Sequence, residues 1–171
     1  MSDLPHGWAE TTIGELCDRT NGFVQTGPFG SDLHASDYTD NGTPVIMPSN
    51  LGRNRLIEDG IARVGREHVE RLRTHQVQTN DIVFPRRGDV ARYAVIDSHS
   101  QGWLCGTGCL LIRFGDNEVI DSRYLGYWLG TTTVENWLLS NAVGTTMPNL
   151  NTSILKALPV PLPPLLSGVG F

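Results

Sequence analysis

Arginines gathered in the middle of the chain are the residues whose type and spacing are best suited to chemistry. Nine of the twelve arginines lie between positions 53 and 92, whereas Lys156 is the sole lysine. A planar guanidinium can form two parallel hydrogen bonds with a phosphate or a guanine edge, which an ammonium cannot do. The pattern favours a surface that meets phosphates and base edges. The alternative is a surface on which these arginines form ion pairs with nearby acids.

The charge of the chain is polarised along its length. The formal net charge is −5, which by itself argues against a nucleic-acid partner. Residues 53–92 hold nine arginines and six acids, a balance of +3, while residues 1–52 hold one arginine and seven acids, a balance of −6. The distribution of charge, more than its sum, indicates what the chain can bind.

Several catalytic sites lack an essential residue in this sequence. Residues 22–27 begin like a phosphate-binding loop, but Pro28-Phe29 follows where Lys and Ser or Thr are required. Many nucleases place a lysine two residues after a metal-binding acid, and here two apolar residues precede Lys156. The Asn/Asp-Pro-Pro-aromatic motif of DNA amino-methyltransferases is missing, because Pro163-Pro164 lies between leucines. No Gly-x-Ser-x-Gly elbow frames a catalytic serine. We therefore expect a chain without catalytic residues.

The three cysteines, Cys17, Cys105 and Cys109, do not suit a metal site or a disulfide framework. Structural zinc needs four ligands, typically in close pairs, and the five histidines are scattered. The chain also shows no signal peptide, and no apolar run approaches the roughly 20 residues of a membrane span. We expect buried, reduced thiols in a cytoplasmic protein without a metal.

The apolar periodicity predicts an α+β fold with strands and loops in the first two-thirds and helices in the last third. Strands are expected at 8–12, 43–47, 81–84, 92–96, 103–105 and 109–113. Helices are expected from Thr12, which precedes Glu15 by three residues as in a capping box, to near Cys17, and at 67–73, 121–130, 133–142 and 151–157, the last capped by Asn151. Residues 20–43 are interpreted as a glycine-punctuated loop region, and 159–164 as an extended proline-rich segment. The four tryptophans are expected in the core.

Six phrases in a fixed order are similar to those of a known family. They are Leu4-Pro5-His6-Gly7-Trp8, residues 25–34 with the start Gln-Thr-Gly-Pro-Phe-Gly-Ser, residues 42–46, residues 81–88 with the end Arg-Arg-Gly, Trp103-Leu104-Cys105-Gly106-Thr107-Gly108-Cys109, and residues 144–151 followed by 158–165. Together they resemble the target-recognition domains of type I restriction–modification specificity subunits. The resemblance covers residues 4 to about 165.

The resemblance implies a reader of double-stranded DNA, with a β-rich N-terminal lobe followed by a small α/β lobe. A complete subunit of this family has two such domains separated by long helices, and each domain reads one half of a split target. It joins bacterial adenine methyltransferase subunits and, indirectly, translocase–nuclease subunits. S-adenosylmethionine, ATP and Mg²⁺ are expected only in those partners, and no cofactor in this chain.

The end of the chain departs from the family pattern. We assign residues 1–165 to the recognition domain and 166–171 to a tail outside it, because the Glu-Gln and long helix of the family do not follow. In the family that helix docks the methyltransferase, so the sequence does not tell whether this chain assembles with methyltransferase subunits. The alternative function is a truncated partner-binding or regulatory protein that associates with the methyltransferase without productive DNA binding.

The residue types suggest which positions meet DNA. Arginine turns and glycine-rich loops can approach phosphates, and Arg, Asn and Gln side chains read base edges. The candidates are Arg86, Arg87 and Arg92, the loop residues Gly30 and Ser31, and Arg53, Arg55, Asn50, Asn54 and Gln25. Each of these is equally compatible, taken alone, with a solvated loop residue. Residues 144–149 are interpreted as a structural turn that orders the next helix. The DNA target itself does not follow from phrases that the family shares.

Overall fold

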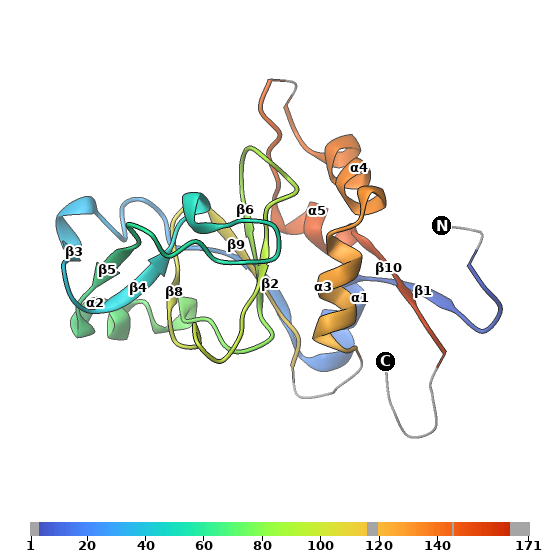
Figure 1. The fold of residues 1–171 in the computed structure, drawn as a ribbon, viewed down its shortest axis with the longest axis horizontal. Helices are drawn as coiled ribbons and strands as arrows, with labels where there is room; N and C mark the ends of the chain where they lie inside the picture. Colours follow the sequence, from blue (N-terminus) through green and yellow to red (C-terminus); the bar gives the residue numbers. More distant parts are fainter. Residues whose placement is uncertain (1–3, 116–119, 145, 165–171) are drawn as a thin grey trace.

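The longest apolar runs form a middle sheet in the structure, a computed structural model that describes residues 4–115, 120–144 and 146–164. This sheet, of order β2-β9-β6-β7, lies between a second sheet, β3-β5-β4-β8, and a group of helices (Figure 1). A two-stranded ribbon, β1-β10, lies with the helices. The predicted α+β layout is confirmed, with one refinement: β1 and the first helix belong to the C-terminal lobe.

The secondary structure alternates short strands with short helices. The strands are β1 Ala9–Thr12, β2 Phe23–Thr26, β3 Tyr38–Thr39, β4 Thr43–Ile46, β5 Ala62–Val64, β6 Ile82–Pro85, β7 Ala94–Val95, β8 Leu104–Cys105, β9 Cys109–Arg113 and β10 Pro159–Leu162. The α-helices are α1 Ile13–Thr20, α2 Arg66–Arg71, α3 Ser122–Leu129, α4 Thr132–Asn141 and α5 Thr152–Ala157. Three 3-10 turns are η1 Ala35–Asp37, η2 Pro48–Asn50 and η3 Arg73–His75. None of the helices within the described residues is long and apolar enough to cross a membrane.

Antiparallel pairing decides which loops meet at each end of the middle sheet. Thr26 at the end of β2 pairs with Leu110 of β9, and Pro85 at the end of β6 pairs with Cys109 of β9. The chain therefore leaves β2 and β6, and enters β9, at one end of the sheet. The other end, where β2 begins and β9 ends, lies next to α1.

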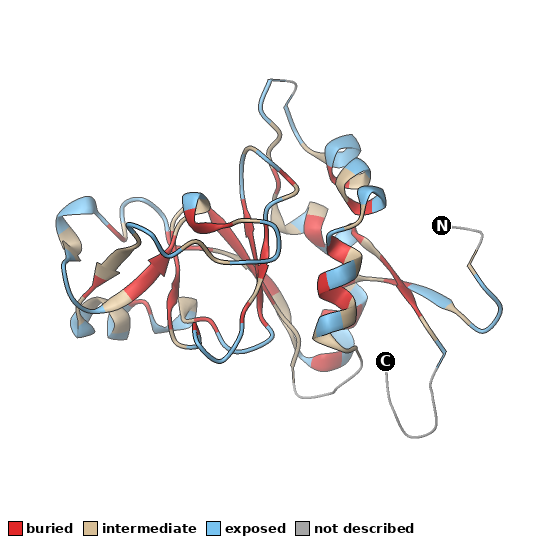
Figure 2. Ribbon diagram, in the orientation of Figure 1, coloured by how far each residue is buried: buried red, intermediate tan, exposed pale blue. Residues whose placement is uncertain are grey.

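Both faces of the middle sheet are buried (Figure 2). Successive side chains of a strand point to opposite faces. On β6, Ile82 and Phe84 lie in the core shared with the helices, and Val83 lies in the core shared with the second sheet. β9 alternates in the same way. This double burial explains why both strands are continuous apolar runs in the sequence.

Capping side chains set where the helices begin. Thr12 accepts a hydrogen bond from the Glu15 amide, and Asn151 accepts one from the Ile154 amide, so both predicted N-caps are confirmed. The first helix continues to Thr20, beyond the expected end near Cys17, and ends at Asn21 in the left-handed conformation. Of the tryptophans, Trp103 is buried, Trp128 and Trp137 pack against the helical core, and Trp8 is half-buried.

The interpretation of residues 20–43 as loop is wrong in part, because β2, η1 and β3 lie within this range. These strands are two to four residues long, and pairing with β9 and β5 stabilises them rather than any local pattern. The strand β5 is likewise not predicted by the apolar periodicity.

The segment expected to be merely extended, 159–164, pairs with β1 over Pro159–Leu162. Its prolines fit because β10 has a partner on one side alone, which leaves the other edge without a ladder. The tail 166–171 lies outside the described residues.

A buried ion pair closes the helix-side end of the middle sheet. The Arg113 guanidinium donates to both Asp81 carboxylate oxygens, with Nε–Oδ1 and Nη2–Oδ2 distances of 2.9 and 2.7 Å. The Asp81 side chain is 3% exposed and that of Arg113 is 19% exposed. Burial raises the pKa of the Asp81 carboxyl, and the hydrogen bonds from Arg113 and the Gln78 amide oppose that rise. The Asp81 carboxylate therefore depends on Arg113 and the Gln78 amide to stay charged in the interior.

We predict that Arg113→Met lowers the free energy of unfolding by about 3 kcal/mol near pH 7, because it leaves a buried carboxylate uncompensated. Without Arg113 the folded-state pKa of Asp81 rises further above its unfolded value, so the destabilisation should shrink as the pH falls and the carboxyl binds a proton. Urea unfolding at about pH 4.5 and 7 measures both effects.

The matched control is Arg123→Met, because Arg123 forms an ion pair with Asp121 but is 86% exposed. It should cost less than about 1 kcal/mol at either pH. Equal costs for the two variants would contradict the structural role assigned to Arg113.

Candidate nucleic-acid interface

Loops from four parts of the chain converge at the end of the middle sheet opposite α1. They surround a hollow of about 380 Å³, here called the loop pocket. Its walls are Thr26, residues 27–30 after β2, Pro48 of η2, Arg86 and Arg87 after β6, and residues 107–109 before β9. Three of the phrases that carried the family resemblance thus lie together, because the strand register brings their ends to one place.

Backbone hydrogen bonds hold these loops against one another. The Gly27 amide donates to the Cys109 carbonyl, and the Arg86 amide donates to the Gly108 carbonyl, both at 2.8 Å. Gly27 must be a glycine, since a Cβ there would lie 2.1 Å from the Gly106 carbonyl oxygen. Gly88, with φ of +97°, provides the left-handed conformation that turns the chain after the two arginines. The loop pocket is therefore built from fixed backbone.

A second layer supports the arginine turn from the C-terminal lobe. The Leu150 amide donates to the Arg86 carbonyl at 2.8 Å, and the Gly88 amide donates to the Pro148 carbonyl at 3.1 Å. The Asn149 side-chain amide donates to the Val143 carbonyl at 3.3 Å. The described residues of 144–149 thus act as a structural turn, as the sequence suggested, and they also brace the arginine turn; residue 145 lies outside the described ranges.

The arginines of the middle segment are not paired with acids. Among the described residues, the arginine–carboxylate ion pairs involve Arg113 and Arg123, and none of the nine arginines between 53 and 92. Arg86 and Arg87 are both exposed beside the loop pocket. The alternative of an internally ion-paired surface is therefore wrong for the described residues, and the exposed Arg86 and Arg87 guanidiniums are open to an external anion.

A second group of candidates follows η2. Arg53, Arg55 and Asn54 are exposed, and the backbone of Arg53 bridges to Tyr93, the residue after the exposed Arg92. The Asn54 side-chain oxygen accepts from the Val95 amide at 3.1 Å, so this side chain anchors its loop to β7. The structure thus joins the segments of Arg53 and Arg92, away from the walls of the loop pocket.

The structure gives Asn50 an internal role that argues against its choice as a base-reading candidate, whereas Gln25 is half-buried with one internal hydrogen bond and stays a prediction. Asn50 is 5% exposed; its side-chain oxygen accepts from the Met47 amide at 2.8 Å and its nitrogen donates to the Ile57 carbonyl at 2.9 Å. Gln25 donates to the Thr74 carbonyl at 2.9 Å. Both amides resemble external readers in the sequence. Nearby backbone groups occupy both ends of the Asn50 amide, and a backbone carbonyl far along the chain accepts from the Gln25 nitrogen. Gly30 lines the loop pocket and Ser31 follows it in an exposed position.

Among the pocket residues that were not site candidates, the side chains of Phe29 and Thr107 are notable. Phe29 is 67% exposed, which is unusual for an aromatic side chain in a loop braced by backbone hydrogen bonds. Thr107 also lines the pocket, and its Oγ1 is buried without a hydrogen-bond partner. The Pro-Phe-Gly context of Phe29 was visible, but no sequence signal separates a Phe that enters the core from one that faces solvent.

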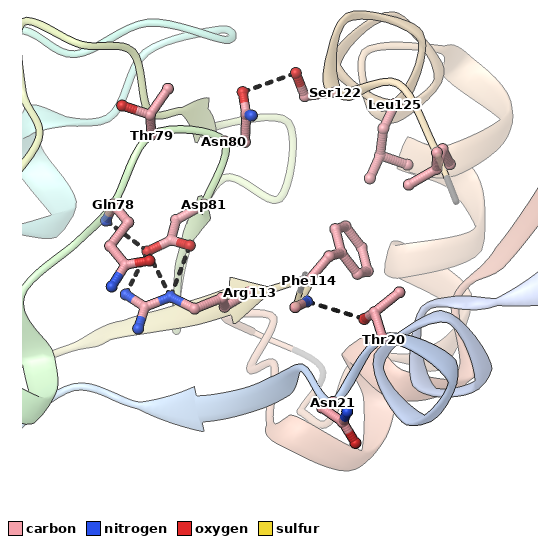
Figure 3. A pocket seen from close by; sticks show the side chains of 12 residues that line it. Thr20, Asn21, Gln78, Thr79, Asn80, Asp81, Arg113, Phe114, Ser122 and Leu125 are labelled. Carbon is pink, nitrogen blue, oxygen red and sulfur yellow. Dashed lines mark hydrogen bonds and ion pairs between the residues drawn. The ribbon is translucent and has the colours of Figure 1, made fainter. Parts of the chain in front are cut away.

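A larger hollow of about 440 Å³ lies at the opposite end of the middle sheet and is lined by polar residues (Figure 3). Its polar side chains are largely used internally: Asp81 binds Arg113, Ser122 donates to Asn80 at 2.9 Å, and Thr20 accepts from the Gly115 amide at 3.0 Å. In the described part of the chain, no group of three or more His, Cys, Asp or Glu residues could hold a metal. The loop pocket, with its unpaired cations, is the better candidate for a ligand.

The cysteines are free and buried, as expected. Burial raises the pKa of the Cys17 thiol to about 11, and the neighbouring Asp18 adds to the rise. A hydrogen bond with Cys105, together with burial, raises the pKa of the Cys109 thiol well above its usual value. The Cys17 and Cys109 thiols stay protonated near neutral pH, and all three cysteines serve as core residues.

The chain is similar to proteins of one known family. The family model described as "Type I restriction modification DNA specificity domain" matches residues 5–167. Two curated relatives are each 20% identical and are matched over 96% of this chain: the type I restriction enzyme EcoDI specificity subunit of Escherichia coli and the MjaVIII specificity subunit of Methanocaldococcus jannaschii. The matches cover 33% and 38% of those proteins, so the chain spans about a third of their length.

Solved structures show the same fold. The HsdS subunit from Thermoanaerobacter tengcongensis superposes with a TM-score of 0.62 over 95% of this chain and 34% of that one. The S subunit of a type I restriction-modification system from M. genitalium gives 0.58 over 94% and 36%. Both are 20% identical in sequence. The confirmed fold is thus that of one domain of such a subunit.

We predict that Gly27→Ala lowers the free energy of unfolding by about 1–3 kcal/mol, because the added Cβ forces two backbones apart. Gly30→Ala is the matched control: no atom lies within 4 Å of a Cβ at Gly30, and the change should stay within about 0.5 kcal/mol. Urea unfolding compares the two. A stable Gly27→Ala chain would show that the loops do not converge as described.

We also predict that the native chain resists alkylation by iodoacetamide at about pH 8. With a pKa of about 11, the thiolate fraction of Cys17 is roughly a hundredfold smaller than that of a thiol with a pKa of 9. Mass spectrometry should find the cysteines unmodified in the native chain and fully modified in urea. Rapid native labelling would contradict their burial.

Proposed function

Because the chain belongs to the type I restriction modification DNA specificity domain family, we propose that it reads one half of a bipartite DNA sequence and performs no chemistry itself. The observation that carries the proposal is the convergence of loops at one end of the middle sheet. There, Arg86 and Arg87 are exposed beside the loop pocket without an acidic partner among the described residues. A rigid sheet that holds several loops in place at one end suits a module that binds its ligand through those loops.

The proposed contacts divide into two kinds. Arg86 and Arg87 contact phosphates, which position the duplex without reading its sequence. Arg53, Arg55 and Arg92, on the neighbouring segments, are the proposed base readers, because a guanidinium can bond both acceptors of guanine in the major groove. Asn54 has its amide nitrogen left for a base, since its oxygen accepts from Val95. Gly30 and Ser31 offer backbone amides to a phosphate.

The proposed partners follow from the family and from the names of the relatives. The whole subunit would place an adenine methyltransferase and, through it, a translocase–nuclease on the DNA that this domain selects. S-adenosylmethionine, ATP and Mg²⁺ would be bound by those partners in the cytoplasm, so the proposed role of this chain needs binding alone.

We predict that the chain binds duplex DNA with an affinity that falls as salt rises, because neutralised phosphates release counterions. Arg86→Ala/Arg87→Ala should weaken binding about tenfold or more at roughly 50 mM salt. It should also reduce the slope of log K against log salt by about 1 for each phosphate that an arginine no longer neutralises. Fluorescence anisotropy with a random-sequence duplex measures both quantities.

The control is Arg19→Ala/Arg123→Ala, which removes the same charge from exposed positions on α1 and α3. It should leave the slope nearly unchanged. If the two double variants behave alike, the arginine turn is not the phosphate contact. The absence of measurable affinity for duplex DNA at low salt, even with a cognate methyltransferase present, would contradict the proposed function.

A further inference from the structure

We propose that the loop pocket accepts one nucleotide whose base has left the duplex stack, with the base beside Phe29 and its phosphate on Arg86 and Arg87. This inference rests on the proposed function and extends it, because it names the part of the DNA that enters the pocket. The pocket, the aromatic ring and the two cations belong to one set of loops.

The size of the pocket argues for a nucleotide over a phosphate group alone. A volume of about 380 Å³ lies in the range of pockets for small organic ligands, roughly 300–1,000 Å³. A single phosphate would leave most of this space empty. Glycines, prolines, an aromatic ring and a cysteine supply much of the wall, and these groups suit the flat, weakly polar face of a base.

The charge of the pocket argues for an anionic ligand. Arg86 and Arg87 are the charged residues that line it, and neither has an ion-pair partner among the described residues. A ligand with an apolar ring and a nearby negative charge satisfies both the wall and the cations. A nucleotide of DNA has both features.

Phe29 provides a stacking surface at the pocket. It is 67% exposed, although its loop is held by a hydrogen bond from the Asp32 amide to the Phe29 carbonyl at 2.8 Å. An ordered, exposed aromatic ring next to unpaired arginines is the arrangement on which unstacked bases rest in other nucleic-acid sites. Solvent exposure of this ring is unfavourable in the free chain, and a stacked base would cover it.

Thr107 provides a hydrogen-bonding group that has no partner among the described residues of the free chain. Its Oγ1 is buried and unpaired, and an unpaired buried hydroxyl is costly. Because Thr107 lines the pocket, a rotation of its side chain would let the polar edge of a bound base supply the missing hydrogen bond. Extrusion of a base is unfavourable, and less so when the base is mismatched, so stacking and this bond can offset it.

The first experiment uses the isotope-labelled chain with deoxynucleoside 5′-monophosphates, unphosphorylated deoxynucleosides and inorganic phosphate as separate probes. We expect the monophosphates to shift the amide resonances of Gly27, Gly30 and Gly108, with a Kd on the order of 1 mM. Each of the other two probes should bind at least about tenfold more weakly. Shifts of equal size with inorganic phosphate would overturn the inference, because the pocket would then be a phosphate clamp.

The second experiment compares a matched duplex with one that carries a single T·T mismatch. We expect about tenfold tighter binding to the mismatched duplex, since its base leaves the stack at lower cost. Phe29→Ala should remove this preference. Tyr127→Ala should keep it, because Tyr127 is an aromatic residue that is 80% exposed on α3 and does not line the loop pocket.

The two proposals can fail separately. If the matched duplex binds through Arg86 and Arg87 while the mismatch brings no gain and the nucleotides cause no shift, the inference is overturned and the proposed function stands. A chain that binds neither duplex overturns the proposed function. A mismatch preference that survives Phe29→Ala also overturns the inference, because the base then rests elsewhere.

Discussion

The antiparallel register of β2, β9 and β6 is the constraint on which the rest of the structure depends. Pairing of Thr26 with Leu110 and of Pro85 with Cys109 brings three distant loops to one end of a sheet. A slip by one residue would exchange the two buried faces of a strand, replacing Ile82 and Phe84 in the helical core by Val83. It would also displace each loop by about 3.4 Å along the strand, which would break the walls of the loop pocket. Core packing therefore positions the candidate site without any exposed residue of the site taking part.

The sequence was informative where local patterns and structure coincide. The apolar runs at 82–85 and 109–113 needed no partner to be recognised as strands, and Thr12 and Asn151 marked helix starts through their own side chains. β2 and β5 could not be recognised, because the order of β2 comes from β9, far along the chain, and that of β5 from a small sheet. Single side chains were hardest: Asn50 and Phe29 differ in burial for reasons that only the folded chain contains. Thus the sequence predicted the arginine turn, but not the pocket beside it.

The chain separates two uses of arginine. Arg113 is held inside by Asp81 and serves the fold, whereas Arg86 and Arg87 lie outside without acids among the described residues. This separation explains how a protein with a net charge of −5 can present a cationic site. The acidic excess lies in residues 1–52, with a balance of −6, whereas the arginine turn lies in the segment 53–92, with a balance of +3. Net charge alone is a poor guide to the partner of a polarised chain.

The ribbon of β1 and β10 brings the two ends of the described fold together. Ala9 pairs with Leu162, so the two ends of the described fold run side by side, and in Figure 1 both lie beyond the helices, on the far side from the second sheet. Domains whose ends are adjacent can be inserted into a host chain with little disturbance. A unit of this shape can be joined to a host chain at one place, while substitutions in the loops at the opposite end of the middle sheet leave the join undisturbed.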